Sequence, residues 1–221
     1  MHLTHPHSPH FNQHYWSLLA SGPAEKAHTY LHGNHLPARF STQPFTVAEL
    51  GFGTGLTFLL TWALACHTGT PLTFISYELH PLSLTELEPI HAAFPPELQP
   101  LATQLRTAYT STHGWNLITL EGVTLHLYIG DATQGILTHP HPAHAWFLDG
   151  FSADVNPALW SESLFHHIYA HTTSGGTATT YSVARAVRNA LGSAGFHTQK
   201  VKGHYPKFHM LAAHKPARTP D

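Results

Sequence analysis

Charged side chains and cysteine are scarce in this sequence. Asp, Glu, Lys and Arg make up only 10% of the 221 residues, and the formal net charge is −2, which by itself does not indicate a nucleic-acid-binding protein. The single cysteine, Cys66, excludes an intramolecular disulfide and a metal site built from cysteines alone. A chain of this length suits one α/β domain with a filled core and is too short for two large domains.

Long apolar runs are also missing. No stretch of about 18 apolar residues is present, so we expect no transmembrane helix. The first residues, MHLTHPHSPHF, contain neither a basic start nor an apolar run, so we expect no secretory signal. Together these absences predict a cytoplasmic protein.

Histidine, in contrast, is abundant, with 23 residues scattered along the chain. They can be replacements for charged residues on the surface, or they can mark a metal-binding protein, although structural zinc sites show close His or Cys pairs at defined spacing. The candidates for adventitious metal binding are His2, His5, His7, His10, His139 and His141. We favour surface replacement and expect no functional metal.

The few charges are unevenly distributed. Residues 1–150 have a net charge of −6, whereas residues 151–221 have a net charge of +4. The basic residues of this C-terminal part are Arg185, Arg188, Lys200, Lys202, Lys207, Lys215 and Arg218. Such a division can present one basic face to a polyanion, or it can have no spatial meaning, and the sequence leaves both interpretations open.

Strand and helix patterns alternate along most of the chain. Expected strands cover 46–51, 72–79, 123–131, 143–150, 176–182, 196–203 and 208–215, with the last two as an antiparallel pair. Expected helices cover 24–31, 56–67, 82–93, 97–108 and 183–195, and Asn156-Pro157 predicts a further helix, capped by Asn156, that runs to about His171. This alternation predicts a mostly parallel sheet covered on both faces.

A glycine-rich loop follows the first expected strand. It reads Glu49-Leu50-Gly51-Phe52-Gly53-Thr54-Gly55 and leads into an apolar helix. Glycines let the backbone approach a ligand, and a helix N-terminus attracts carboxylate or phosphate groups. The loop fits a dinucleotide site and an S-adenosylmethionine site about equally, or a tight turn without a ligand. Its start inside the strand disfavours a nicotinamide enzyme.

Acidic residues stand at the ends of three further strands. Ligands of open parallel sheets bind beyond these carboxyl ends. Glu78 is placed to accept hydrogen bonds from ribose hydroxyls, and Asp131 from an adenine amino group. Asp149 ends the fourth strand, in FLDGF. Each acid alone is more often a solvated strand end, but their joint occurrence predicts a nucleoside-containing ligand.

Three runs in the chain resemble one family. AELGFGTGLTFLLTW, FLDGFSADVNPALWSESLF and TATTYSVARAVRNALGSAGF are similar to the methyltransferase domain of the tRNA wobble-uridine modification protein MnmC. The resemblance extends upstream to HYWS and EKAHTYLHGNHLPARF and covers roughly residues 11–214. It implies a Rossmann-like class I S-adenosylmethionine-dependent methyltransferase with a mostly parallel seven-stranded sheet, preceded by an N-terminal extension over residues 1–40 and forming one domain over 41–221.

The resemblance also implies a reaction. A methyl group would pass from S-adenosylmethionine to the primary amine of 5-aminomethyl-uridine or its 2-thio form at the tRNA wobble position. The FAD domain of the bifunctional relatives would be absent, so the aminomethyl substrate would arrive ready-made. The tRNA anticodon stem–loop would be the partner, bound through the basic C-terminal part.

Site roles follow from the same resemblance. Asp149 would orient the amine. Phe151 would pack against the uridine, wall off the path of the methyl group, or simply belong to the core. The donor would be held by residues of the loop and the strand ends: Glu49, Gly51, Phe52, Gly53, Thr54, Gly55, Glu78, Asp131 and Asp149. Asn156 and Pro157 would be structural.

The chain departs from its relatives where they carry an Arg/Lys cluster. Only Lys200, Lys202 and Lys207 stand in that stretch, so we expect weaker tRNA binding at physiological salt. Two alternatives therefore stay open. The chain can methylate another small-molecule or protein amine, or it can be a non-catalytic nucleotide-binding or RNA-binding module.

Overall fold

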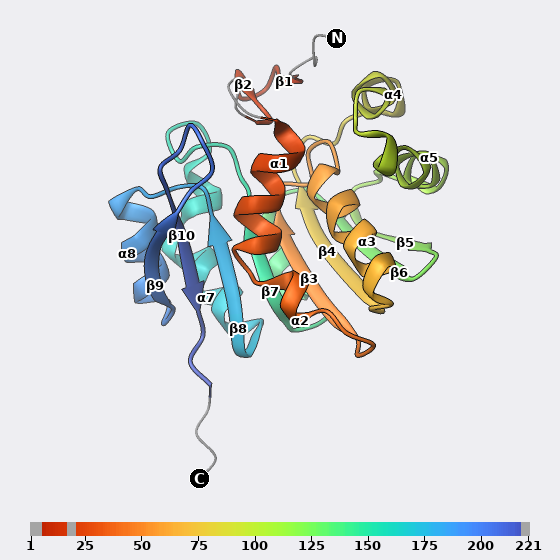
Figure 1. The fold of residues 1–221 in the computed structure, drawn as a ribbon. Helices are drawn as coiled ribbons and strands as arrows, with labels where there is room; N and C mark the ends of the chain where they lie inside the picture. The colour runs from red at the N-terminus through yellow and green to blue at the C-terminus, as the bar shows by residue number, and fades with distance from the viewer. Residues whose placement is uncertain (1–5, 17–20, 218–221) are drawn as a thin grey trace.

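A mixed sheet of eight strands forms the centre of the computed structural model, which describes residues 6–16 and 21–217 (Figure 1). The strand order is β5-β6-β4-β3-β7-β8-β10-β9. The strands are β3 (Phe45–Leu50), β4 (Leu72–Glu78), β5 (Gly114–Leu120), β6 (Val123–Ile129), β7 (Ala143–Leu148), β8 (Thr172–Thr180), β9 (His197–Lys202) and β10 (His209–His214). A separate two-stranded ribbon pairs β1 (His7–Ser8) with β2 (Gln13–His14).

The five central strands, β6-β4-β3-β7-β8, are parallel. From β3 the chain moves outward through β4 to β6 on one side, then returns to place β7 on the other side of β3. The order of the strands therefore reverses between β3 and β7, and such a reversal is where open α/β sheets bind ligands.

The prediction of seven strands was wrong by one. All seven expected strands are present, and the antiparallel pairing of β9 with β10 is confirmed. The eighth strand, β5, pairs antiparallel with β6 through a turn at Glu121-Gly122, where Gly122 has φ of +72°. As an edge strand, β5 leaves Leu117 65% exposed, so its hydrophobic pattern is weaker than that of a central strand.

Helices cover both faces of the sheet. α3 (Leu56–Thr68), α4 (Leu84–Ala92) and α5 (Gln99–Ala108), with the 3-10 turn η2 (Pro96–Leu98), lie on one face. α6 (Ala132–Gly135), η3 (Ile136–Thr138), α7 (Glu162–Ala170) and α8 (Arg185–Ser193) lie on the other. Strand residues alternate between two cores, with Phe147 in the first and Trp146 and Leu148 in the second. Among the described residues no helix has the length and apolar character needed to cross a membrane.

The helix predicted from Asn156 is divided in two. Pro157–Trp160 form a 3-10 turn, η4, and the Asn156 side chain makes no capping hydrogen bond. The regular helix α7 starts at Glu162, where the Ser161 hydroxyl accepts a hydrogen bond from the Leu164 N–H. The Asn-Pro pair therefore starts a turn, and Ser161 is the true helix cap.

The N-terminal helix crosses the face of the sheet beside α3. α1 (Gly22–Lys26) continues directly into the π-helical segment η1 (Ala27–His32), and the short helix α2 (Leu36–Arg39) follows. The side chain of Asn34 is fully buried and donates hydrogen bonds to Tyr30 O, Trp146 O and Thr179 Oγ1. One amide group thus links this helix to β7 and β8. The boundary predicted at residue 40 stays a prediction.

Candidate functional site

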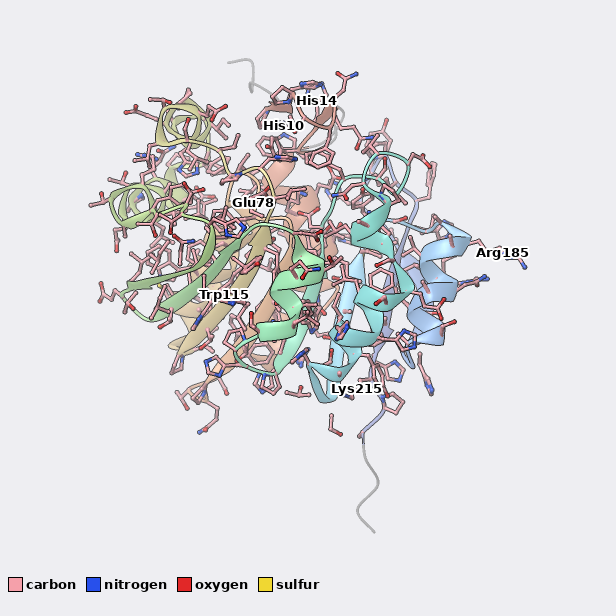
Figure 2. All side chains as sticks on the ribbon, turned by 180° about the vertical axis from the view of Figure 1, so that it is seen from behind. His10, His14, Glu78, Trp115, Arg185 and Lys215 are labelled. Carbon is pink, nitrogen blue, oxygen red and sulfur yellow. The ribbon has the colours of Figure 1, made fainter. Side chains whose placement is uncertain are left out.

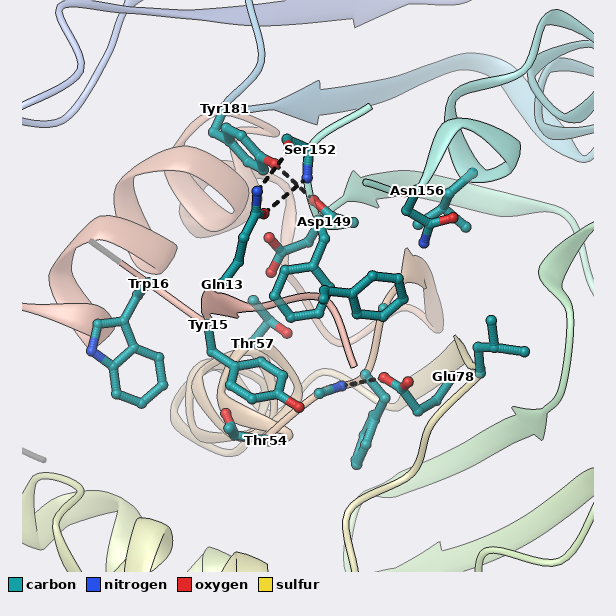
Figure 3. Close-up of a pocket in the computed structure, with 18 of the residues that line it drawn as sticks. Gln13, Tyr15, Trp16, Thr54, Thr57, Glu78, Asp149, Ser152, Asn156 and Tyr181 are labelled. Carbon is teal, nitrogen blue, oxygen red and sulfur yellow. Dashed lines mark hydrogen bonds between the residues drawn. The ribbon is translucent and has the colours of Figure 1, made fainter. Parts of the chain in front are cut away.

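A cavity of about 600 Å³ opens where β3, β4, β6 and β7 end. It lies at the reversal point of the strand order, and its volume is typical of small-molecule sites, which measure roughly 300–1,000 Å³. Its wall is formed by the loops that follow these strands, the start of α3, the helix α1–η1 and the segment 11–16 (Figure 3).

The glycine loop forms one side of the cavity. Gly51, Gly53 and Gly55 have φ of +89°, +52° and +72°, a region that favours glycine. A Cβ atom on Gly51 would lie 2.6 Å from the carbonyl oxygen of Asp149, so this glycine permits the close approach of the loops after β3 and β7. Leu56 and Thr57, at the N-terminus of α3, also line the cavity.

Glu78 holds the glycine loop in place. Its Oε2 accepts a hydrogen bond of 2.7 Å from the Gly53 N–H (Figure 3), and its Oε1 accepts one of 2.8 Å from the His80 N–H. A carboxylate has about four acceptor positions, so two remain for a ligand. Glu78 can therefore bind ribose hydroxyls while it fixes the loop.

Asp131 follows β6 and also has a structural task. Its Oδ1 accepts hydrogen bonds of 2.8 Å from both the N–H and the hydroxyl of Thr133, so Asp131 is the N-terminal cap of α6. The residue lines the cavity, and its second carboxylate oxygen is available to a ligand.

Asp149 ends β7 on the opposite side of the cavity. Lys26 Nζ donates to both carboxylate oxygens, at 2.7 and 2.5 Å, and the Tyr30 hydroxyl donates to Oδ1 at 2.7 Å. Burial raises the pKa of the Asp149 carboxyl above its ordinary value, and Lys26 and Tyr30 act in the opposite direction. Burial and the neighbouring Asp149 raise the pKa of Tyr30, so its hydroxyl stays a donor.

Lys26 and Tyr30 were missed by the sequence analysis. They stand four residues apart on the N-terminal helix and so share one face. Asp149 is more than a hundred residues away along the chain, and no local motif joins the three. The sequence feature that could have indicated them is the spacing of Lys26 and Tyr30 within the upstream run EKAHTYLHGNH.

Aromatic side chains cover the cavity from the N-terminal segment. Phe11 stacks on Phe151 with ring centroids 4.6 Å apart, and Tyr15 packs against Phe151 at 5.4 Å. Gln13 joins the same loop through two hydrogen bonds with Ser152, of 2.9 Å from its Nε2 to the hydroxyl and of 3.3 Å from the Ser152 N–H to its Oε1 (Figure 3). Phe151 is therefore a wall of the cavity rather than part of either main core.

Glu49 lies behind the cavity, inside the sheet. It is fully buried, and its carboxyl accepts hydrogen bonds from the hydroxyls of Thr57 and Ser76. Burial is the main reason why the pKa of Glu49 is raised well above its ordinary value. Its place favours support of the β3–α3 junction over direct contact with a ligand.

The structure brings most of the predicted site residues to one cavity. Those that line it are Gly51, Phe52, Gly53, Thr54, Glu78, Asp131, Asp149 and Phe151. Gly55 and Glu49 stand behind this lining, Gly55 as the left-handed cap of α3.

Within residues 151–217, the basic residues of the C-terminal part do not form one surface. Lys215 donates hydrogen bonds of 2.7 Å to the carbonyls of Tyr169 and Thr172, and Figure 2 shows it far from His10 and His14, near the end of the molecule where the chain leaves. Lys207 lines the cavity. The exposed basic side chains of α8 and β9 are Arg185, Arg188, Lys200 and Lys202, whereas Arg218 lies outside the described residues.

The histidines form no metal centre in the described ranges, where no group of three or more His, Cys, Asp or Glu could hold a metal ion. His2 and His5 of the N-terminal group lie outside those ranges. His139 is buried between Trp146 and Tyr77, and burial lowers its pKa to about 3, so it is neutral at physiological pH.

Comparisons with known proteins agree with this geometry. Residues 96–216 match a family described as S-adenosyl-L-methionine-dependent methyltransferase. The chain is 42% identical over 194 residues to the tRNA 5-methylaminomethyl-2-thiouridine biosynthesis bifunctional protein MnmC of Hahella chejuensis, covering 83% of this chain and 31% of that protein. The protein of the same name from Nitrosospira multiformis is 41% identical over 210 residues, with 90% and 34% covered. The chain thus spans about a third of the length of these curated relatives.

A solved structure shows the same fold. The crystal structure of MNMC2 from Aquifex aeolicus matches with a TM-score of 0.80 at 20% identity, covering 96% of this chain and 67% of that one. The Rossmann-like class I methyltransferase fold is therefore confirmed, and so is the resemblance to MnmC.

Proposed function

The chain belongs to the S-adenosyl-L-methionine-dependent methyltransferase family, and from this premise we propose that it methylates the primary amine of 5-aminomethyl-uridine, or its 2-thio form, at the tRNA wobble position. The observation that carries the proposal is the position of Asp149, which lies beside the glycine loop at the cavity and has its carboxylate held by Lys26 and Tyr30. The identity of the proposed substrate comes from the curated relatives, which are named for the biosynthesis of the methylated nucleoside.

The residues present fit the methyl donor. The glycine loop lets a ligand approach the backbone, and the N-terminus of α3 suits the donor's carboxylate. The open acceptor positions on Glu78 and Asp131 suit the ribose hydroxyls and the adenine amino group. When bound, S-adenosylmethionine supplies an electrophilic methyl group on a positively charged sulfur.

Asp149 would orient the amine. Lys26 uses one acceptor position on each carboxylate oxygen and Tyr30 a second on Oδ1, so one position on Oδ2 remains for an N–H of the substrate. In that position the nitrogen lone pair can point at the methyl carbon, and such positioning accounts for much of the rate of a displacement. The nitrogen–carbon bond then forms as the carbon–sulfur bond breaks.

Lys26 has two effects on this step. Its positive charge favours the ionised form of the buried Asp149, which makes the carboxylate a hydrogen-bond acceptor. The same charge disfavours a second ammonium nearby, so the substrate amine is driven toward its neutral, nucleophilic form. Asp149 therefore acts through orientation and charge rather than as a strong base.

The anticodon stem–loop would reach this cavity across α8 and β9. These two elements pack together and carry the exposed side chains of Arg185, Arg188, Lys200 and Lys202. Four fixed charges can contact four phosphates, which predicts a clear dependence of the affinity on salt.

The proposal is tested with the purified chain, methyl-labelled S-adenosylmethionine and bulk tRNA from cells that lack this methylation. We expect label at the wobble uridine with the wild type and a fall of about 10²–10⁴-fold with Asp149→Ala, the usual range for removal of a group that orients or accepts a proton. Calorimetric titration with the donor confirms that the variant is folded. Donor binding without label in any tRNA would contradict the proposal and point to another amine or to a non-catalytic module.

A further inference from the structure

The tip of the β9–β10 hairpin, residues 203–208, presents two aromatic rings to solvent. Tyr205 is 67% exposed and Phe208 is 80% exposed, the two highest fractions among the large hydrophobic side chains of the described residues. Exposure of a large apolar side chain costs free energy unless a partner covers it, and a pair of such rings on one short turn indicates a contact surface.

The tip is held in a defined shape. The Gly203 N–H donates to Phe208 O at 2.9 Å, and the Lys207 N–H donates to His204 O at 2.8 Å. A Cβ atom on Gly203 would lie 2.4 Å from the Lys207 carbonyl oxygen, so only glycine permits this turn. The exposed rings therefore project from an ordered scaffold.

Lys207 fastens the tip to the rim of the cavity. Its ammonium lies 3.8 Å from the centre of the Tyr181 ring and 3.5 Å from Glu25 Oε1, and all three residues line the cavity that contains Asp149. Figure 1 shows the hairpin loop at the same end of the sheet as α1 and the β1–β2 ribbon. A ligand whose reacting group enters the cavity thus has its adjacent parts beside the tip.

Basic side chains lie on the strand that leads to the tip. Lys200 and Lys202 lie exposed on β9, and the sequence contains no acidic residue between Glu162 and Asp221. A second copy of this surface would be repelled, whereas a polyanion would be attracted. Exposed aromatic rings among cations are the arrangement with which proteins bind single-stranded nucleic acid, because each base can stack on a ring while the backbone meets the charges.

Building on the proposed function, we propose that Tyr205 and Phe208 form a stacking platform for the unpaired anticodon-loop bases next to the wobble uridine. Sequence-specific recognition of RNA is concentrated in such loops, whose bases can turn outward and stack on aromatic side chains. The platform binds these neighbours while the wobble base enters the cavity toward Asp149. It thereby compensates for the small number of fixed charges that this chain offers to phosphates.

The test measures binding of an anticodon stem–loop that carries 2-aminopurine immediately 5′ to the wobble nucleotide. Stacking on a ring quenches the 2-aminopurine fluorescence, and anisotropy of an end label gives the affinity in the same titration. We expect about a tenfold loss of affinity for each of Tyr205→Ala and Phe208→Ala, and loss of the quenching, since a base–aromatic stack is worth about 1–3 kcal/mol and 1.4 kcal/mol is tenfold. Phe208→Trp should preserve both signals.

Two control variants isolate the aromatic contribution. Leu117→Ala removes a side chain of similar exposure, 65%, from β5 at the opposite edge of the sheet, and should change nothing. Phe208→Leu keeps an apolar side chain without a ring face and should lose affinity like Phe208→Ala. Full affinity in Phe208→Leu would overturn the proposal, and so would quenching that persists when Tyr205→Ala and Phe208→Ala are combined. The proposal would also be overturned if the wild type were a dimer that these substitutions dissociate, because the rings would then be covered by a second copy.

The two proposals fail separately. Binding is measured without methyl transfer. If RNA binding depends on the rings but the chain methylates no tRNA, the stacking platform is supported and the proposed reaction is refuted. Methylation of the stem–loop with an unchanged KM in the double alanine variant would retain the reaction and refute the platform. Methylation of free 5-aminomethyl-uridine serves as an internal reference, because it should be insensitive to both rings.

Discussion

The two sides of the cavity are built from the chain in different ways. On the donor side, the glycine loop and the acids after β4 and β6 belong to successive strand–helix units, and their polar groups bind backbone close by, as Asp131 does with Thr133. On the acceptor side, Asp149 meets Lys26 and Tyr30, 123 and 119 residues away along the chain, and Ser152 meets Gln13 at a separation of 139. The donor side is thus assembled from neighbouring strand–helix units, whereas the acceptor side is assembled by tertiary structure.

We expect the largest effect on stability and activity from a substitution on the acceptor side, at Lys26. Lys26→Met leaves the buried Asp149 without its cation, which we expect to cost about 3–5 kcal/mol of unfolding free energy and to remove most methyl transfer. Because the like charge that favours the neutral amine is lost, the remaining activity should need a higher pH.

Lys26→Arg is the matched control for this change. It keeps the positive charge, so the pH profile of kcat/KM should stay close to that of the wild type even if the rate falls. Chemical denaturation and pH–rate profiles provide the two measurements. If the pH profile of kcat/KM shifts equally in both variants, the geometry of the lysine side chain rather than its charge matters at residue 26.

A smaller effect is expected on the donor side, at Glu78. Glu78→Ala removes the acceptor of the Gly53 N–H and of the proposed ribose contact, and each hydrogen bond to a charged group is worth about 1.5–3 kcal/mol. We expect donor affinity, measured by calorimetry, to fall about 10–100-fold, with tRNA affinity unchanged. An equal loss of tRNA affinity would break the division between the two sides.

Glu49, behind both sides, should affect stability alone. Its pKa is raised in the folded state, so the folded chain binds the extra proton and this contribution to stability is lost as pH rises above about 4.5. The slope is at most about 1.4 kcal/mol per pH unit for one group. Glu49→Gln has no such proton, so its unfolding free energy should fall less than that of the wild type between pH 5 and the raised pKa of Glu49. Parallel curves in urea titrations would contradict this assignment.

The smallest effect concerns the many histidines of the chain. Free histidine titrates near pH 6.5, so a chain with 23 histidines gains positive charge as the solution is acidified. We expect tRNA binding at constant salt to tighten roughly threefold to tenfold from pH 7.5 to 6. The buried His139 contributes nothing in this range because its pKa is lowered to about 3. A flat affinity would exclude the histidines from RNA binding.

The same comparison explains what could be predicted from the sequence. The alternation of strands and helices, the glycine loop and the acids at Glu78, Asp131 and Asp149 are local patterns, and seven of the eight strands and the shared cavity followed from them. The partners of Asp149 could not be predicted because only folding brings α1–η1 across the sheet. Strand β5 was missed because it buries Asn116 and exposes Leu117, which reverses the usual alternation of buried apolar and exposed polar residues. The helix start at Asn156 was misplaced because Ser161 competes as a better-placed cap.

The buried amide of Asn34 has a consequence for cooperativity. It binds Tyr30 O, Trp146 O and Thr179 Oγ1 at once, and its Oδ1 accepts from the Thr177 hydroxyl. The helix that carries Lys26 and Tyr30 therefore cannot swing away without exposing unsatisfied groups on β7 and β8. In hydrogen-exchange terms, the amides of this helix should open together with the central strands, as one unfolding unit, so the site is lost only when the sheet itself opens.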